Sequence, residues 1–162
     1  MWKRPILNNP QRASMVSQEL QSLLFSLLDF AHAGKQAHWN LYGRDFLATH
    51  EKLDEIVESS RSFADLVAER IVKLGFAADG RTAAVAEHSK MPEMPTGFDT
   101  VEAMQTAICE RLKVLVDQIR STQEQVAEMD AMSEDLVIEI GREFETHLWM
   151  MQAMEGTPPA AG

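Results

Sequence analysis

The sequence predicts an all-α fold in which four long helices form a bundle with one long connection. Two observations lead to this prediction. Apolar residues recur at three- and four-residue spacing along four long segments, as they do on one face of a helix. Glycine and proline are scarce, with 8 and 6 copies beside 10 methionines, which favours helices over many short strands. A chain of 162 residues is long enough for one domain with a single core.

The first two helices are predicted in the N-terminal half. Prolines and asparagines among the first residues predict a flexible arm, after which a helical pattern runs from residue 14 to about 40. A short turn at 41–44 precedes a second helix from about 45 to 74, and Gly75 provides its C-terminal stop.

The second half begins with a long connection at 76–98, in which 82–89 are predicted to form a short helix. A capping box formed by Asp99 and Glu102 opens the third long helix, and the fourth opens near residue 130. The predicted divisions are a flexible N-terminal arm (1–13), a four-helix bundle (14–156) and a short C-terminal tail (157–162).

The long second connection gives the bundle its predicted class. It makes the second and third long helices parallel, which a simple up-and-down bundle does not need. Short first and third connections with a long second one are typical of a ferritin-like bundle. A four-helix bundle without any cofactor has the same helix pattern, so the pattern alone leaves both interpretations open.

Composition limits the function classes. The formal net charge of -10 repels nucleic acid and anionic membranes and attracts cations. A single cysteine, Cys109, excludes an intrachain disulfide and suits a reducing cytoplasm. No apolar run approaches the ~20 residues of a membrane helix, and no secretory segment follows the N-terminal basic pair. We therefore expect a soluble, cytoplasmic protein with no membrane partner.

Four potential metal ligands lie on the second predicted helix, namely His50, Asp54, Asp65 and Glu69. At about 100° per residue they share one stripe roughly 100° wide, beside the apolar stripe that faces the core. Asp54 and Asp65 are 11 residues apart, about 16 Å along a helix, so one metal ion cannot bind both pairs within one chain. The alternative interpretation is a solvated helix face.

The four positions are nevertheless symmetric, because 50 and 69 have the same sum as 54 and 65. Two antiparallel copies that cross at the serines at 59 and 60 place His50 opposite the partner's Glu69, and Asp54 opposite the partner's Asp65. We expect the small serines to permit close approach of the two helices. Imidazole and carboxylate ligands together suit iron(II), zinc or manganese.

His38 lies near the end of the first predicted helix. A lone histidine at this place is often a favourable partner of the helix dipole, so its role as a ligand stays open on spacing alone. The sequence contains no Glu-x-x-His pair, which di-iron sites inside a single bundle use twice. A metal centre within one subunit is therefore disfavoured, and a centre between subunits remains.

The sequence around these residues resembles the signature of the Dps family, the miniferritins. The 12-residue step from His38 to His50 and the order of the acids make the resemblance specific. The similar segments are Lys35-Gln36-Ala37-His38-Trp39-Asn40, Phe46 to Glu55, Ala68-Glu69-Arg70, Leu74-Gly75 and, near the C-terminus, Leu148-Trp149.

The resemblance implies a homo-oligomeric shell of twelve four-helix subunits that oxidises iron(II), preferentially with hydrogen peroxide. The ferric iron is stored inside the shell, which protects the cell from oxidative damage. All five family ligand positions carry the family residue here. The implied catalytic and metal-binding residues are His38, His50 and Asp54 from one subunit and Asp65 and Glu69 from the other.

Three further residues, Trp39, Trp149 and Asp135, match family positions. Trp39 and Trp149 occupy places where the family keeps tryptophans near the centre, and they either absorb stray oxidising equivalents or serve as apolar packing. Glu134 and Asp135 open the fourth predicted helix, and Asp135 matches a position that lines a threefold pore for iron. Capping and stabilisation of the helix dipole explain these two acids equally well.

The alternative function is a DNA-compacting stress protein in which iron oxidation is secondary. In the family, DNA binding accompanies lysine-rich tails. Here the arm before Glu19 holds only Lys3, Arg4 and Arg12, and the tail at 157–162 carries no charged side chain. Twelve such arms on one shell add only weak affinity for DNA, because the net charge of each subunit is negative. Contacts between cations and DNA phosphates also weaken steeply with salt. We therefore do not expect DNA to be the main partner.

Overall fold

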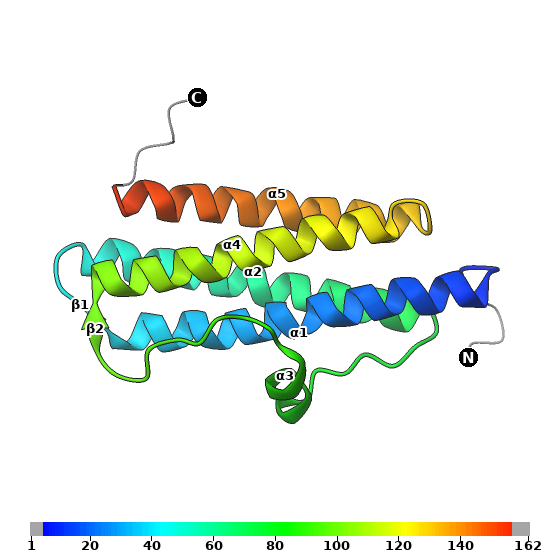
Figure 1. The fold of residues 1–162 in the computed structure, drawn as a ribbon, viewed down its shortest axis with the longest axis horizontal. Helices are drawn as coiled ribbons and strands as arrows, with labels where there is room; N and C mark the ends of the chain where they lie inside the picture. The colour runs from blue at the N-terminus through cyan, green and yellow to red at the C-terminus, as the bar shows by residue number, and fades with distance from the viewer. Residues whose placement is uncertain (1–4, 157–162) are drawn as a thin grey trace.

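The computed structural model describes residues 5–156 and confirms the all-α bundle with a short helix in its long connection (Figure 1). Four long helices account for most of the described chain. The elements in chain order are α1 (Pro10–Asn40), β1 (Leu41–Tyr42), α2 (Phe46–Lys73), α3 (Thr82–His88), β2 (Asp99–Thr100), α4 (Val101–Val126) and α5 (Ala131–Met154).

Helix α1 begins four residues earlier than predicted. The side chain of Asn9 accepts hydrogen bonds from the backbone N–H groups of Gln11 and Arg12, at 3.0 and 3.1 Å, so Asn9 is the N-cap. Pro10 then occupies the first helical position, where its missing N–H costs nothing. Residues 10–13 are therefore helical rather than part of a flexible arm, and residues 1–4 of the predicted arm lie outside the described part of the chain.

The start of α4 also differs from the prediction. Thr100 is the N-cap, and its hydroxyl accepts a hydrogen bond of 3.2 Å from the backbone N–H of Ala103. The side-chain Oδ1 of Asp99 accepts a hydrogen bond of 2.8 Å from the backbone N–H of Thr100. The predicted capping box of Asp99 and Glu102 is thus wrong, because Thr100 is the N-cap and Ala103, three residues later, has no side-chain acceptor to complete a box.

The long connection sets the direction of the helices. Figure 1 shows α1 antiparallel to α2 and α4 antiparallel to α5, with the connection crossing the length of the bundle so that α2 and α4 run parallel. The two-residue strands β1 and β2 pair in parallel, with Leu41 opposite Asp99, and tie the end of α1 to the start of α4. This is the crossover arrangement that the sequence predicts.

Close helix packing fixes where α2 lies. Gly34 of α1 faces α2 so closely that an added Cβ would lie 2.6 Å from a methyl carbon of Val57. Phe30 and Phe144 meet edge to face in the fully buried core, with ring centroids 6.1 Å apart. Gly75, with φ at +98°, ends α2 as predicted. Among the described residues, no helix is both long and apolar enough to cross a membrane.

Candidate metal centre

His38 and His50 face each other where α1 meets α2. Their rings stack with centroids 3.6 Å apart and planes 23° from parallel. Nδ1 of each ring lies 3.0 Å from the backbone carbonyl oxygen of the other residue. A carbonyl oxygen only accepts hydrogen bonds, so both Nδ1 atoms carry the proton and donate. Each ring therefore keeps the lone pair on Nε2 for a metal ion, in the tautomer that metal-binding histidines use.

Asp54 joins these two histidines from the next turn of α2. Its Oδ1 lies 3.3 Å from Nδ1 of His38 and accepts a hydrogen bond from Nζ of Lys35 on α1. The hydrogen bond from Lys35 is the main cause that lowers the pKa of Asp54 below its ordinary value of 3.8. Asp54 is therefore a carboxylate at neutral pH, and Lys35 holds the oxygen that a metal ion needs.

Asp65 and Glu69 lie further along α2, and both are exposed. Glu69 accepts a hydrogen bond of 2.8 Å from Nζ of Lys73, which is the main cause that lowers its pKa. The distance from Asp54 to Asp65 along the helix is about 16 Å, so the two acids cannot join the histidines of their own chain. Within residues 5–156 of one chain, no three His, Cys, Asp or Glu side chains are placed to hold a metal ion.

The serines in the middle of α2 do not face outward. Ser60 is fully buried and donates a hydrogen bond of 2.9 Å to the carbonyl oxygen of Ile56. Ser59 turns toward α5, where its hydroxyl lies 2.9 Å from Nε2 of His147 and 3.3 Å from Oε1 of Glu143. The prediction that these serines form the crossing point is wrong. At about 100° per residue they fall outside the stripe that carries the ligands.

Glu58 and Arg61 occupy the middle of the stripe in place of the serines. Both are exposed, and neither has an ion-pair partner within the described part of the chain. Their position numbers have the same sum as those of the ligand pairs. Two exposed apolar residues with that same sum, Leu47 and Val72, lie near the ends of α2. The stripe of α2 that carries the ligands thus consists of Leu47, His50, Asp54, Glu58, Arg61, Asp65, Glu69 and Val72, and all of these except the half-buried His50 are exposed.

The acids at the turn between α4 and α5 have different roles. Asp130 is buried and bonded to Arg70 and Ser133, and these bonds hold its pKa below the ordinary value although burial alone would raise it. Glu134 accepts a hydrogen bond of 2.9 Å from the side-chain amide of Gln123. Asp135 is exposed. Of the two candidate pore acids, Asp135 is thus the more available to a passing cation.

Trp39 and Trp149, which the resemblance assigns to the neighbourhood of the centre, are both exposed. Trp39 follows His38 directly and is 67% exposed, while Trp149 on α5 is 64% exposed. Neither is therefore packed into the core of its own chain. Their exposure removes intrachain packing as the explanation for these two residues.

The fold defines a ferritin-like protein, and comparison with known proteins agrees. The family model of a ferritin-like domain matches residues 17–157. The chain superposes on Mycobacterium smegmatis Dps with a TM-score of 0.92 at 30% identity, covering 98% of this chain and 91% of that one. It also superposes on Dps from Microbacterium arborescens in its high iron form, with a TM-score of 0.88 at 31% identity, covering 93% of this chain and 98% of that one.

Curated relatives narrow the class to one family. The DNA protection during starvation protein of Mycolicibacterium smegmatis is 32% identical over 143 residues, which cover 88% of this chain and 78% of the relative. The protein of the same name from Agrobacterium fabrum is 33% identical over 135 residues, which cover 83% of each chain. The chain belongs to the Dps family of miniferritins.

Proposed function

We propose that two copies of this chain oxidise iron(II) at sites that neither copy contains alone. The observation that carries the proposal is the stripe of α2 from Leu47 to Val72, on which two groups of potential ligands lie about 16 Å apart at symmetric positions. In an antiparallel pair of α2 helices, His50 meets the partner's Glu69 and Asp54 meets the partner's Asp65. His38 accompanies His50 through their reciprocal hydrogen bonds. Twofold symmetry then produces two identical centres.

The remaining residues of the stripe support the same alignment of the two helices. The twofold axis that aligns the ligands also brings Glu58 opposite the partner's Arg61, so opposite charges meet twice near the middle of the two α2 helices. Toward the helix ends, Leu47 lies opposite the partner's Val72, and both are apolar and partly exposed. A shifted register loses these charge and apolar matches together with the ligand pairs.

The ligand types suit iron in both oxidation states. Carboxylate oxygens from Asp54, Asp65 and Glu69 are hard ligands that stabilise the ferric product. The Nε2 atoms of His38 and His50 complete a weaker set around iron(II), which leaves positions open for the oxidant. The mixture of imidazole and carboxylate therefore binds the substrate without trapping it in one oxidation state.

Iron(II) competes with lysines for two of these carboxylates. Asp54 is bonded to Lys35 and Glu69 to Lys73. Both carboxylates have lowered pKa values, so they do not need to lose a proton when the metal binds near neutral pH. The lysine ammonium groups must swing away instead. In this proposal the lysines keep the carboxylates charged and are displaced by the cation.

Hydrogen peroxide is the proposed oxidant. One peroxide accepts two electrons, one from each of two iron(II) ions, and becomes two waters when two protons are supplied. Oxidation in pairs of electrons avoids release of a radical, and Trp39 and Trp149, both exposed, are the proposed reductants of any oxidising equivalent that escapes. The ferric product is stored within a dodecameric shell, which iron(II) reaches along a threefold pore lined by Glu134 and Asp135.

Complementation between two inactive variants tests the shared site. One subunit carries His50→Ala and Asp54→Ala, and the other carries Asp65→Ala and Glu69→Ala. Each variant alone has no complete centre, whereas a mixed pair regains one of its two centres. Co-assembled shells should therefore recover part of the wild-type rate of peroxide-driven iron(II) oxidation, followed by ferric absorbance. If mixed shells that are confirmed to contain both variants show no iron(II) oxidation, the site is not shared between copies.

The choice of oxidant is tested separately. Protein loaded anaerobically with iron(II) receives equimolar hydrogen peroxide or dissolved oxygen, and the ferric absorbance is followed. Peroxide should oxidise the bound iron faster. An equal or faster reaction with oxygen contradicts the proposed oxidant but leaves the shared site standing.

DNA protection is the second candidate function, because the curated relatives carry that name. The net charge of -10 opposes it, and within residues 5–156 the segment before Glu19 contributes one cation, Arg12. Gel retardation with linear DNA at low and moderate salt tests this candidate. We expect retardation to disappear at moderate salt, since few phosphate contacts are available to replace counterions.

A further inference from the structure

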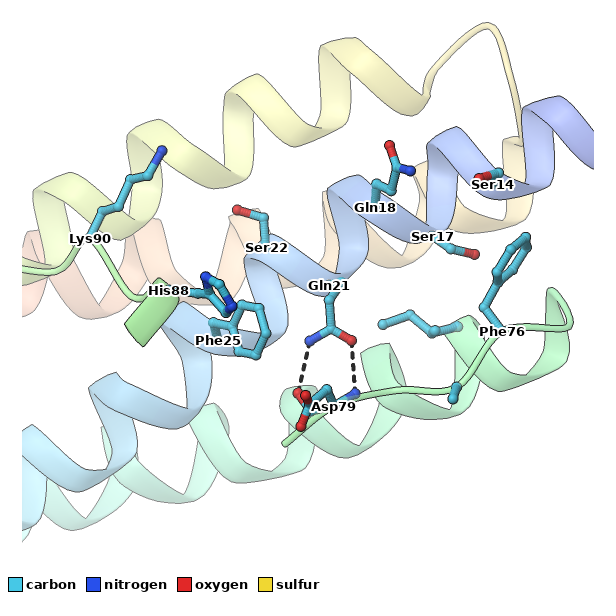
Figure 2. A pocket seen from close by; sticks show the side chains of 12 residues that line it. Ser14, Ser17, Gln18, Gln21, Ser22, Phe25, Phe76, Asp79, His88 and Lys90 are labelled. Carbon is cyan, nitrogen blue, oxygen red and sulfur yellow. Dashed lines mark hydrogen bonds between the residues drawn. The ribbon is translucent and has the colours of Figure 1, made fainter. Parts of the chain in front are cut away.

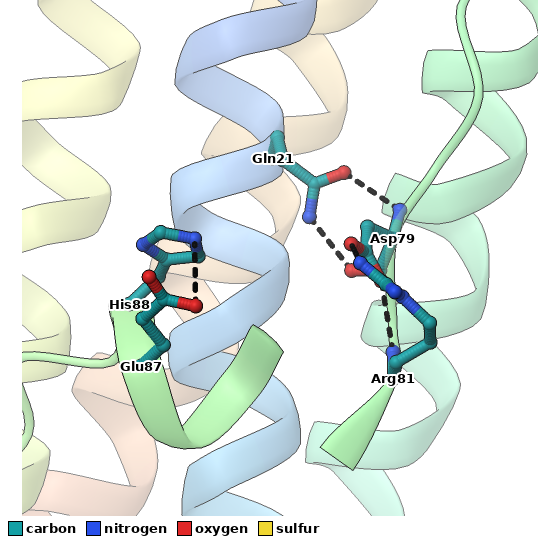
Figure 3. A network of polar contacts seen from close by, with 5 residues as sticks. All are labelled: Gln21, Asp79, Arg81, Glu87 and His88. Carbon is teal, nitrogen blue, oxygen red and sulfur yellow. Dashed lines mark hydrogen bonds and ion pairs between the residues drawn. The ribbon is translucent and has the colours of Figure 1, made fainter. Parts of the chain in front are cut away.

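A groove beside the first half of α1 is divided by a bridge between its walls (Figure 2). The side-chain amide of Gln21 donates to the backbone carbonyl of Asp79 at 2.8 Å and accepts from the backbone N–H of Asp79 at 2.9 Å. The carboxylate of Asp79 is bonded in turn to Arg81, at 2.9 and 2.6 Å, which lowers its pKa to about 2 (Figure 3). The charged groups of this bridge are therefore already paired with each other.

A second groove, of about 610 Å³, lies further along α1, between that helix and the connection at 91–96. Two hydrogen bonds connect its walls, one at each end. The hydroxyl of Ser89 donates to Oδ2 of Asp29, and the side-chain amide of Gln36 donates to the carbonyl oxygen of Pro95 at 3.4 Å. Asp29 and Gln36 are seven residues apart, about 10 Å along α1. The length between the two bonds suits a small molecule.

A buried arginine of α4, Arg111, lines this second groove, although it is only 2% exposed. Its Nη2 lies 3.1 Å from Oδ1 of Asp29, so the two residues form an ion pair. The angle of this contact does not make a hydrogen bond, and neither Nε nor Nη2 has a hydrogen-bond partner within the described chain. Buried polar groups in folded proteins are nearly always hydrogen-bonded. Nε and Nη2 share the edge of the guanidinium that binds a carboxylate through two parallel hydrogen bonds.

The second groove holds charges of both signs close together. Among the described residues that line it, Asp29 and Glu93 are the only acids and Arg111 is the only arginine or lysine. The side chain of Asp29 is 28% exposed, so its carboxylate is open to a ligand. Burial lowers the pKa of Arg111, but a guanidinium keeps its proton at neutral pH. A simple anion is repelled by the acids and a simple cation by the arginine, whereas a molecule with both charges is favoured by both groups.

The rest of the second groove is apolar. Met91, Pro92 and Met94 of the connection line it together with Ala33 of α1. Met91 and Met94 are half-buried and pack against the main core. Methionine side chains are flexible and adapt to the shape of an apolar neighbour. This part of the groove therefore suits an aliphatic group.

We propose that the second groove binds a free α-amino acid with an aliphatic side chain, such as leucine. The carboxylate bonds to Nε and Nη2 of Arg111, the ammonium group pairs with Asp29, and the side chain lies against Met91 and Met94. In an α-amino acid both charged groups are attached to one carbon atom, which matches an acid and a base 3.1 Å apart. The proposal does not depend on iron oxidation.

Calorimetric titration of the intact, assembled protein with L-leucine tests the proposal. One site per subunit should bind leucine with a Kd on the order of 0.1–1 mM, the range for a ligand of this size. Leucinamide lacks the carboxylate and N-acetylleucine lacks the ammonium group. Each should bind about tenfold more weakly than leucine, because one charge-assisted contact is lost. Glycine should also bind more weakly, because it has no aliphatic side chain to bury.

Two variants locate the charged contacts. Arg111→Met keeps the apolar stem of the side chain but removes the guanidinium, so it should weaken binding of leucine about tenfold without weakening that of leucinamide. Asp29→Asn keeps an acceptor for Ser89 and should weaken binding of leucine about tenfold without weakening that of N-acetylleucine. Arg120→Met makes the same substitution at an exposed arginine of α4 and should leave the Kd unchanged.

Shell assembly and circular dichroism show whether each variant folds before it is titrated. If Arg111→Met does not assemble, Asp29→Asn decides alone, because it changes only the charge of a partly exposed side chain. Absence of saturable leucine binding overturns the proposal. Equal affinity for leucine and leucinamide, or wild-type affinity for leucine in assembled Asp29→Asn, overturns it as well.

Discussion

Reversal of one charge at the middle of α2 tests the proposed alignment of the two copies. In that alignment Glu58 lies opposite the partner's Arg61, and twofold symmetry produces the contact twice. Arg61→Glu therefore removes two attractive pairs and creates two repulsive ones. An exposed ion pair contributes about 0.5 kcal/mol, and a like-charge pair costs a similar amount. The total is about 2 kcal/mol per pair of subunits, or roughly a thirtyfold weaker association.

The assay is a dilution series followed by mass photometry, which measures the protein concentration at which assemblies dissociate. Arg61→Glu should raise that concentration and slow iron(II) oxidation, because the centres need both copies. The double variant Glu58→Arg, Arg61→Glu restores both attractive pairs and should recover most of the loss. Lys113→Glu on α4 is the control for a charge reversal elsewhere. If Arg61→Glu assembles like wild type, or if the double variant is worse than either single one, the alignment is wrong.

Three further predictions concern Lys35 beside the candidate centre, the candidate pore acid Asp135 and the buried thiol of Cys109. Lys35→Met should bind iron(II) up to about fivefold more tightly near neutral pH, because the competing ammonium group is gone. In that variant the pKa of Asp54 rises toward 3.8, so protonation of Asp54 should abolish iron(II) binding at a higher pH than in wild type. Weaker iron(II) binding by the variant in anaerobic calorimetry would contradict the competition between Lys35 and iron. Asp135→Asn should slow iron uptake at low ionic strength, with Glu124→Gln as the control, and an unchanged rate would leave Asp135 as a helix cap. Burial raises the pKa of Cys109 to about 12, so the native thiol should resist iodoacetamide and peroxide at neutral pH, and rapid labelling measured by mass spectrometry refutes this.

The long elements of the fold could be predicted because their signals are local. Apolar periodicity located four helices, and Gly75 marked the end of α2 correctly. The start of α1 was missed because Asn9 and Pro10 read equally well as loop residues and as an N-cap followed by a first helical residue. The pairing of β1 with β2 carries no local signal at two residues each, and the cap of α4 was missed because Asp99 and Thr100 are both good N-cap residues.

The candidate centre could be predicted only as far as helix geometry extends. The symmetric spacing on α2 and the resemblance identified all five potential ligands. Orientation depends on contacts between helices, so the reciprocal bonds of His38 and His50 and the bond from Lys35 to Asp54 were not predictable from spacing. The error at Ser59 arose because small size was taken as the signal for a crossing, whereas angular position decides which residues face outward.

Anomalous scattering from iron-soaked crystals of the assembled protein tests the central claim most directly. Data collected on both sides of the iron absorption edge locate iron without reference to any assumed ligand. The account predicts peaks at the twofold axis, each bounded by His38, His50 and Asp54 of one copy and by Asp65 and Glu69 of the other. Iron bound within a single chain, or absent from the twofold interface while Asp135 or other acids hold it, would contradict the account.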